Sequence, residues 1–159
     1  MNAIQILEKL KSKFPDAILD AKVEGVIEPY AKIKPELIKE VCQFMRDDEE
    51  LNFDYLMCLS GMDYGKGVLG VVYNLNSIKH KHKFTLKVEV ASDAPNVPSI
   101  ESIWKTANWH EREAYDMFGI IFIDHPDLRR MLLPDDWEGH PLRKDYQVQE
   151  FYHGMKVPY

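Results

Sequence analysis

Three residues able to exchange protons lie close together in the chain: His110, Glu113 and Asp116. An imidazole beside a carboxylate can act as a general acid–base pair, with His110 working together with Glu113 or Asp116. The sequence shows no nucleophile beside them and nothing that would form a substrate cavity. A free-standing acid/base enzyme that uses these residues is therefore an alternative rather than the preferred function.

Three glycines, Gly65, Gly67 and Gly70, match the G-x-G-x-x-G spacing of a dinucleotide-binding loop. That motif requires a helix after the glycines, because the helix N-terminus binds the pyrophosphate. Here residues 71–73 are Val, Val and Tyr, which continue as a strand. The glycines therefore predict a hairpin turn, and the chain carries no Walker-type loop, G-x-S-x-G or H-E-x-x-H motif.

The two cysteines, Cys42 and Cys58, stand far apart in apolar surroundings. An iron–sulfur cluster typically takes four thiolates, and a structural zinc takes four ligands from Cys and His. Two distant cysteines supply neither set, so they are interpreted as small hydrophobic residues. The sequence predicts no cofactor and no metal in this chain.

A pair of histidines, His80 and His82, alternates with Lys79, Lys81 and Lys83. The imidazoles could share one face of a strand or turn, but the ammonium groups around them disfavour a bound cation. A solvated hairpin tip is the preferred interpretation. Contact of this tip with anionic lipid or with an acidic partner is the alternative.

The first half of the chain predicts helices packed on a sheet. Helical spacing of apolar residues covers 4–14, and loose alternation around Gly25 predicts two short strands within 17–34. A second amphipathic helix starts at Pro35 and continues to about Met45.

The next segment predicts strands. Residues 51–91 are rich in β-branched and aromatic residues broken by glycines, which indicates a three-stranded antiparallel meander. A loop is expected over 93–98, a short helix capped by Ser99 over 99–105, and a short strand over 120–123.

The helix predicted over 109–118 is the best defined. Asn108 and Glu111 form a capping-box pattern, and Gly119 supplies a left-handed stop. Its polar face carries both charges and an aromatic ring, which is typical of a surface that contacts another protein. The residues placed on this partner-facing surface are Trp109, Arg112, Glu113 and Asp116.

Beyond residue 123 the periodicity ends, and prolines and glycines punctuate a segment of mixed charge with many apolar side chains. Such a segment needs a surface to lie on. The sequence therefore predicts an α+β domain at 1–123, with helices on one side of a mixed, largely antiparallel sheet, and an extended C-terminal arm at 124–159 that packs on a partner subunit. The arm's predicted contact residues are Arg129, Arg130, Trp137, Arg143, Tyr146 and Phe151.

Composition narrows the partners. The formal charge of −6 and pI near 5.5 argue against a nucleic-acid binder, since phosphate neutralisation needs a basic face. No apolar run approaches the roughly 20 residues that span a bilayer, so membrane contact is expected only through a complex. The N-terminus lacks a signal-peptide pattern, which predicts a cytoplasmic chain.

Three motifs carry a resemblance to a known family. They read EREAYDMFGI at 111–120, HPDLRR at 125–130 and LPDDWEGHPLRKDY at 133–146. In these motifs, which cover about a quarter of the sequence, the chain resembles the 30-kDa subunit of the proton-pumping NADH:quinone oxidoreductase.

The resemblance implies a non-catalytic scaffold in the peripheral arm of respiratory complex I, on the cytoplasmic side of the cell inner membrane. It implies packing against the quinone-reducing subunit and other peripheral-arm subunits, with flavin and iron–sulfur clusters held by these partners on the path from NADH to quinone. The equivalent subunit of a ferredoxin-dependent plastoquinone reductase or a membrane-bound hydrogenase is the alternative. The sequence leaves the electron donor and the quinone open.

Overall fold

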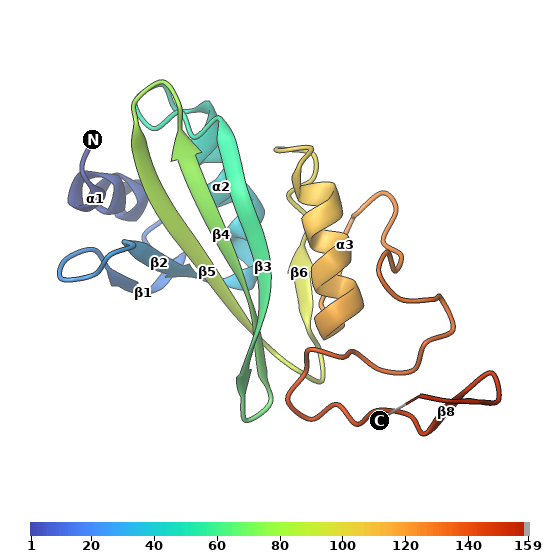
Figure 1. The fold of residues 1–159 in the computed structure, drawn as a ribbon. Helices are drawn as coiled ribbons and strands as arrows, with labels where there is room; N and C mark the ends of the chain where they lie inside the picture. The colour runs from blue at the N-terminus through green and yellow to red at the C-terminus, as the bar shows by residue number, and fades with distance from the viewer. Residues whose placement is uncertain (158–159) are drawn as a thin grey trace.

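A five-stranded sheet in the order β1-β2-β5-β4-β3 forms the centre of the fold (Figure 1). The computed structural model describes residues 1–157, so the last two residues of the predicted arm, 158–159, lie outside the described residues. The sheet strands are β1 (Ile18–Lys22), β2 (Tyr30–Ile33), β3 (Tyr55–Gly65), β4 (Val68–Ser77) and β5 (His82–Ala91).

The three long strands form the predicted antiparallel meander, with β4 paired to both β3 and β5. On β5, Phe84, Leu86 and Val88 are buried, because alternate side chains of a strand point to the same face. β2 pairs with β5 in parallel, while β1 and β2 form the predicted antiparallel pair. The sheet is thus mixed and largely antiparallel, and the predicted α+β class is confirmed.

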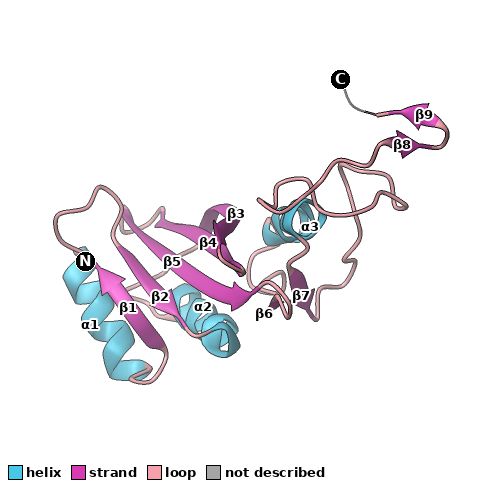
Figure 2. Cartoon of the chain, turned by 90° about the horizontal axis from the view of Figure 1, so that it is seen from below, coloured by secondary structure: helices cyan, strands magenta, loops and turns pink. Residues whose placement is uncertain are grey.

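Two helices, α1 (Ala3–Lys13) and α2 (Ile38–Asp47), cover one face of the sheet (Figure 2). A short 3-10 turn, η1 (Pro35–Leu37), leads into α2. The apolar stripe of α2 is buried and includes Cys42, whose pKa burial raises. This thiol is part of the hydrophobic core, as predicted.

The region before the third helix differs from the prediction. Residues 96–98 form a strand, β6 (Asn96–Pro98), which pairs in parallel with β7 (Ile121–Ile123). Residues 99–105 form turns rather than a helix. The physical reason is tertiary: Ile100, Ile103 and Trp104 are all buried, and the Trp104 indole donates to the Phe53 carbonyl, which a short helix on the surface would not allow.

The third helix, α3 (Ala107–Phe118), packs on β3 and ends at Gly119, which has a φ of 72° as the predicted left-handed stop requires. The contact is close because β3 carries Gly61 there: a Cβ on it would lie 2.5 Å from the Phe118 ring. The predicted capping box at Asn108 is wrong. The N-cap is Thr106, and the Glu111 carboxylate binds Ser99 and Ile100 instead.

Candidate functional site

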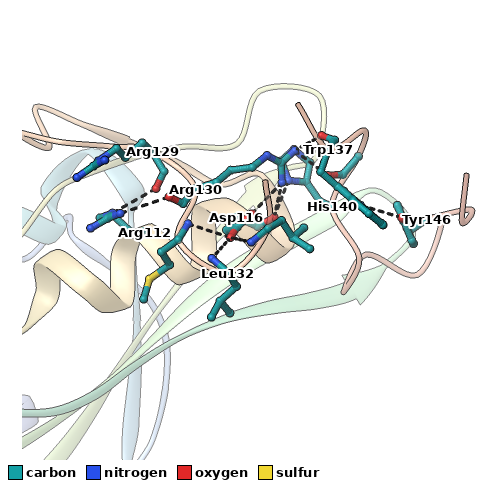
Figure 3. Close-up of polar contacts among 11 residues, drawn as sticks. Arg112, Asp116, Arg129, Arg130, Leu132, Trp137, His140 and Tyr146 are labelled. Carbon is teal, nitrogen blue, oxygen red and sulfur yellow. Dashed lines mark hydrogen bonds and ion pairs between the residues drawn. The ribbon is translucent and has the colours of Figure 1, made fainter. Parts of the chain in front are cut away.

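The side chain of Asp116, in the last turns of α3, organises the start of the C-terminal arm (Figure 3). It is fully buried, and its Oδ2 accepts hydrogen bonds from three successive backbone N–H groups of the arm. The donors are Met131, Leu132 and Leu133, at 3.1, 2.7 and 3.0 Å. Burial alone raises the pKa of this carboxyl, but hydrogen bonds from Arg130 and from these N–H groups outweigh it and lower the pKa.

Arg130 completes the same node from the arm. One guanidinium nitrogen, Nη1, donates to Asp116 Oδ1 at 2.9 Å and to the Asp116 carbonyl at 3.2 Å. The other, Nη2, donates to the carbonyls of Trp137 and Gly139, both at 2.9 Å. Arg130 thereby joins α3 to two further points of the arm, and its side chain keeps only 11% exposure.

The arm also covers the carbonyl end of α3. The last carbonyls of a helix have no partner inside the helix. Here His140 Nδ1 donates to the Asp116 carbonyl at 3.0 Å, the Leu142 N–H donates to Met117 at 3.1 Å, and Arg143 donates to the Phe118 carbonyl. Two cations at this end, Arg130 and Arg143, also complement the helix dipole. Gly119 is required again, since a Cβ there would lie 2.5 Å from His140.

The distal part of the arm is tied to itself rather than to the sheet. The Trp137 indole donates to the Tyr146 hydroxyl at 3.1 Å. Asp136 accepts from the Tyr152 hydroxyl at 2.7 Å and pairs with His153 at 2.6 Å, and these hydrogen bonds lower the pKa of Asp136. Tyr152 lies in a small terminal hairpin of β8 (Phe151–Tyr152) and β9 (Met155–Lys156).

The predicted partner-facing residues divide into two groups. Asp116 is buried inside the chain, so its prediction as a surface residue is wrong: the helical wheel gives the polar face of α3, but the arm covers that face. Arg112 donates to the carbonyls of Arg129 and Arg130. With Arg130, Trp137, Arg143 and Tyr146, it holds the arm on its own chain.

The other predicted residues face outward. Trp109 is 65% exposed, Phe151 is 57% exposed, and Glu113 and Arg129 are exposed as well. Further exposed apolar side chains lie along the arm, and of these Val148 and Met155 lacked any signal in the sequence analysis because no periodicity surrounds them. The set on the arm is Leu132, Leu142, Val148, Phe151 and Met155.

The arm prediction therefore needs a correction. Residues 125–144 are bound to α3, and the Lys144 N–H reaches β3 by donating to Asp63 at 2.8 Å. An arm that leaves its own domain after Ile123 and becomes ordered only on a partner does not describe this stretch. Packing of the arm on a partner stays a prediction, now for the exposed apolar side chains.

The remaining chemical candidates are placed as follows. Asp116 has its oxygens committed to Arg130 and the arm, so the structure does not offer it as a general base beside His110. Gly65 and Gly67 form the predicted turn between β3 and β4, with φ of 78° and 76°. Within residues 1–157, no group of three or more His, Cys, Asp or Glu side chains could hold a metal ion.

The histidines of the hairpin tip bind backbone carbonyls. His80 Nε2 lies 2.9 Å from the Glu49 carbonyl, and His82 Nε2 lies 2.6 Å from that of Leu51. The hairpin between β4 and β5 is confirmed, but His82 is buried rather than solvated, and its pKa is lowered by that burial. No helix among the described residues has both the length and the apolarity to cross a membrane.

The fold and this junction define a class: an α+β domain whose last helix holds an ordered C-terminal arm with apolar side chains directed outward. Comparison with known proteins names the family. Residues 31–152 match the family described as "Respiratory-chain NADH dehydrogenase, 30 Kd subunit", and the chain belongs to this family. The resemblance drawn from the three motifs is confirmed.

Individual relatives agree. An NADH-quinone oxidoreductase subunit from Chloroherpeton thalassium is 54% identical, over 94% of this chain and 63% of the relative, so the chain spans under two thirds of that protein. Its namesake from Chlorobium phaeobacteroides is 46% identical, over 99% of this chain and 96% of the relative. An F(420)H(2) dehydrogenase subunit from Methanosarcina mazei is 41% identical, over 92% and 93%.

Two solved structures share the fold. One is a trypsin-resistant fragment (1-134) of Nqo5, with a TM-score of 0.66 and 29% identity, covering 80% of this chain and 100% of that chain. The other belongs to the membrane-bound sulfane sulfur reductase, an archaeal respiratory membrane complex, with a TM-score of 0.76 and 23% identity, covering 91% and 85%.

Proposed function

We propose that the chain is a scaffold subunit of a proton-translocating NADH:quinone oxidoreductase and performs no chemistry of its own. In this role it packs against the quinone-reducing subunit on the cytoplasmic side of the membrane. Flavin and iron–sulfur clusters belong to other subunits, and the chain meets the membrane only through the complex. Family membership and the names of its relatives support this role.

The observation that carries the proposal is the division of labour along the arm. Its polar groups are satisfied within the chain, since Arg130 and Arg143 bind carbonyls and Asp116 accepts three backbone N–H groups. Its apolar side chains, in contrast, face water: Leu142 is 55% exposed and Met155 is 64% exposed. Protein interfaces have apolar centres and polar rims, and an arm already held in shape loses less entropy on docking.

The interface proposed here consists of the outward residues only. It retains Trp109, Glu113, Arg129 and Phe151 from the sequence analysis. It adds the exposed apolar side chains of the arm that the structure reveals. The internally bonded residues support the interface by fixing the shape of the arm, and they are Arg112, Arg130, Trp137, Arg143 and Tyr146.

The test is assembly of the complex with the full-length chain. Phe151→Ser combined with Met155→Ser removes two exposed apolar groups and is expected to leave the unfolding of the isolated chain unchanged. It should sharply reduce co-purification with the quinone-reducing subunit. The matched control is Ile27→Ser, which removes a fully exposed apolar group from the turn between β1 and β2, 101% exposed. Equal assembly of the double variant and the control would remove the arm from the interface.

A second candidate differs in the electron donor. The relative from Methanosarcina mazei carries the name of an F(420)H(2) dehydrogenase subunit, at 41% identity. The same scaffold could therefore serve a complex with another donor, such as a ferredoxin-dependent plastoquinone reductase or a membrane-bound hydrogenase. Purification of the intact complex in mild detergent decides: an NADH-oxidising flavoprotein in the preparation supports the proposal, and a nickel site in the large partner contradicts it.

A further inference from the structure

The carboxyl group of Glu111 is buried where α3, the loop before it and the start of the arm meet. Its exposure is 0%. Oε2 accepts from the Ser99 hydroxyl at 2.6 Å, and Oε1 accepts from the Ile100 N–H at 2.8 Å. Among the described residues, no Lys or Arg forms an ion pair with it. A buried carboxylate normally requires such a partner, because removing its charge from water is costly.

The one ionisable nitrogen close by, on His125, is turned to another partner. Its Nε2 lies 3.9 Å from Glu111 Oε2, and both side chains are buried. The Asp127 N–H donates to Nδ1 at 3.0 Å, so Nδ1 carries no proton and Nε2 carries one. Nε2 lies 3.1 Å from the Asn108 carbonyl and donates to it. The ring is therefore held in its neutral form and supplies no positive charge to Glu111.

The other groups around the carboxyl add little positive charge. Cys42 from α2 and Tyr73 from β4 are both fully buried, and the Tyr73 hydroxyl has no hydrogen-bond partner among the described residues. Burial raises the pKa of Glu111 most, and the negative charge of Glu101 raises it further. Hydrogen bonds from Ser99 and Ile100 and the charge of Lys39 on α2 lower it, and the resulting pKa is about 7. The hydrogen-bond donors and the lysine do not offset the burial.

We propose that Glu111 is a proton-holding site, neutral in the folded chain in mildly acidic solution, and that loss of its proton loosens the junction between the Ser99–Ile100 loop, α3 and the start of the arm. The proton passes to solvent and leaves a buried carboxylate with two hydrogen-bond donors. That charge is stabilised by water entering the junction, which requires the loop or the arm to move. This inference goes beyond the proposed scaffold function and does not depend on it.

The sign of the pH effect follows from the direction of the shift. The folded chain binds the Glu111 proton more tightly than the unfolded chain does, so the stabilisation is fully present below the ordinary pKa of 4.5 and is lost as the pH rises through about 7. Each unit of difference is a factor of ten in the folding equilibrium constant, so the loss is on the order of a hundredfold or more.

Two measurements on the isolated full-length chain test the proposal. Carbon-13 NMR follows the side-chain carboxyl of Glu111 directly and should give a midpoint near 7. Denaturant unfolding between about pH 5 and 8.5, a range that brackets this midpoint, should show the folding constant of the wild type falling relative to Glu111→Gln, whose amide can bind Ser99 and Ile100 without a charge. Glu113→Gln, on the exposed side of the same helix, is the matched control and should follow the wild type.

The proposal fails if the Glu111 carboxyl titrates near its ordinary value of 4.5. It also fails if the wild type and Glu111→Gln show the same dependence of unfolding on pH. If Glu111→Gln does not fold, the NMR titration of the wild type still decides. Backbone amide exchange at Ile100 provides the local readout: it should speed up with rising pH beyond the intrinsic chemical rate, whereas an amide in the middle of β4 should not.

Discussion

The sheet and the C-terminal arm are both ordered, but different forces order them. The sheet buries apolar side chains on alternate positions of its strands, with Leu69, Val71, Tyr73 and Leu75 of β4 at 1% exposure or less. The arm buries few, and is held by hydrogen bonds to Asp116 and to the carbonyl end of α3. The hydrophobic core determines the fold of the domain, and one buried carboxylate determines the path of the arm. Removing an element of one kind should therefore not reproduce the effect of removing the other.

The largest effect is expected in the sheet. Phe84→Ala removes a ring at 1% exposure from the centre of the core. Such a substitution costs about 3–5 kcal/mol in the free energy of unfolding, through lost burial and a cavity. Chemical denaturation should show sheet and arm unfolding together. A variant that freed the arm alone would show that the two regions are not organised as described.

A smaller and local effect is expected in the arm. Arg130→Met leaves the buried Asp116 without its cation and frees the carbonyls of Trp137 and Gly139. Loss of one partner of a buried pair costs about 3 kcal/mol. This should appear as protease cleavage within 125–144 while the circular dichroism of the sheet is retained.

The conservative variant sharpens this test. Arg130→Lys keeps the charge but cannot bridge Asp116 and the two carbonyls at once. An intermediate rate of cleavage is expected for it. If the lysine variant matched the wild type, charge alone would hold the arm, and the bridging geometry would be unimportant.

The smallest effect is expected at Asn108. Its side chain makes no capping hydrogen bond to α3, whose N-cap is Thr106. Asn108→Ala should therefore change the free energy of unfolding by no more than about 0.5 kcal/mol. A thermal unfolding curve is sufficient to measure it. A loss of about 1 kcal/mol, typical of a removed N-cap, would restore the capping box predicted from sequence.

The sequence predicts those elements that local pattern determines. Phe84, Leu86 and Val88 alternate strictly with polar residues and form β5, and Gly119 ends α3 in the left-handed conformation. β6 is missed because three residues, one of them Pro98, are too few to show a period. The position of the last helix against β3 likewise depends on a single glycine, Gly61, which carries no local signal.

The site shows the same limit. A helical wheel identifies the polar face of α3 correctly, but it cannot say whether water or another segment covers that face. Asp116 is therefore predicted to meet a partner, while its actual partners lie 14 to 17 residues further along the same chain. Glu111 is predicted to cap its own helix, and it binds Ser99, 12 residues earlier. Contacts at such separations are products of tertiary structure.

The most direct test of the order in the arm is hydrogen exchange of three amides in the isolated chain, those of Met131, Leu132 and Leu133. If Asp116 orders the arm without any partner, these amides are protected in the wild type and lose their protection in Asp116→Ala, while amides of β4 remain protected in both. Exchange of the three amides at the rate of an unstructured peptide in the wild type would contradict this role of Asp116, because the arm would then depend on a partner for its order.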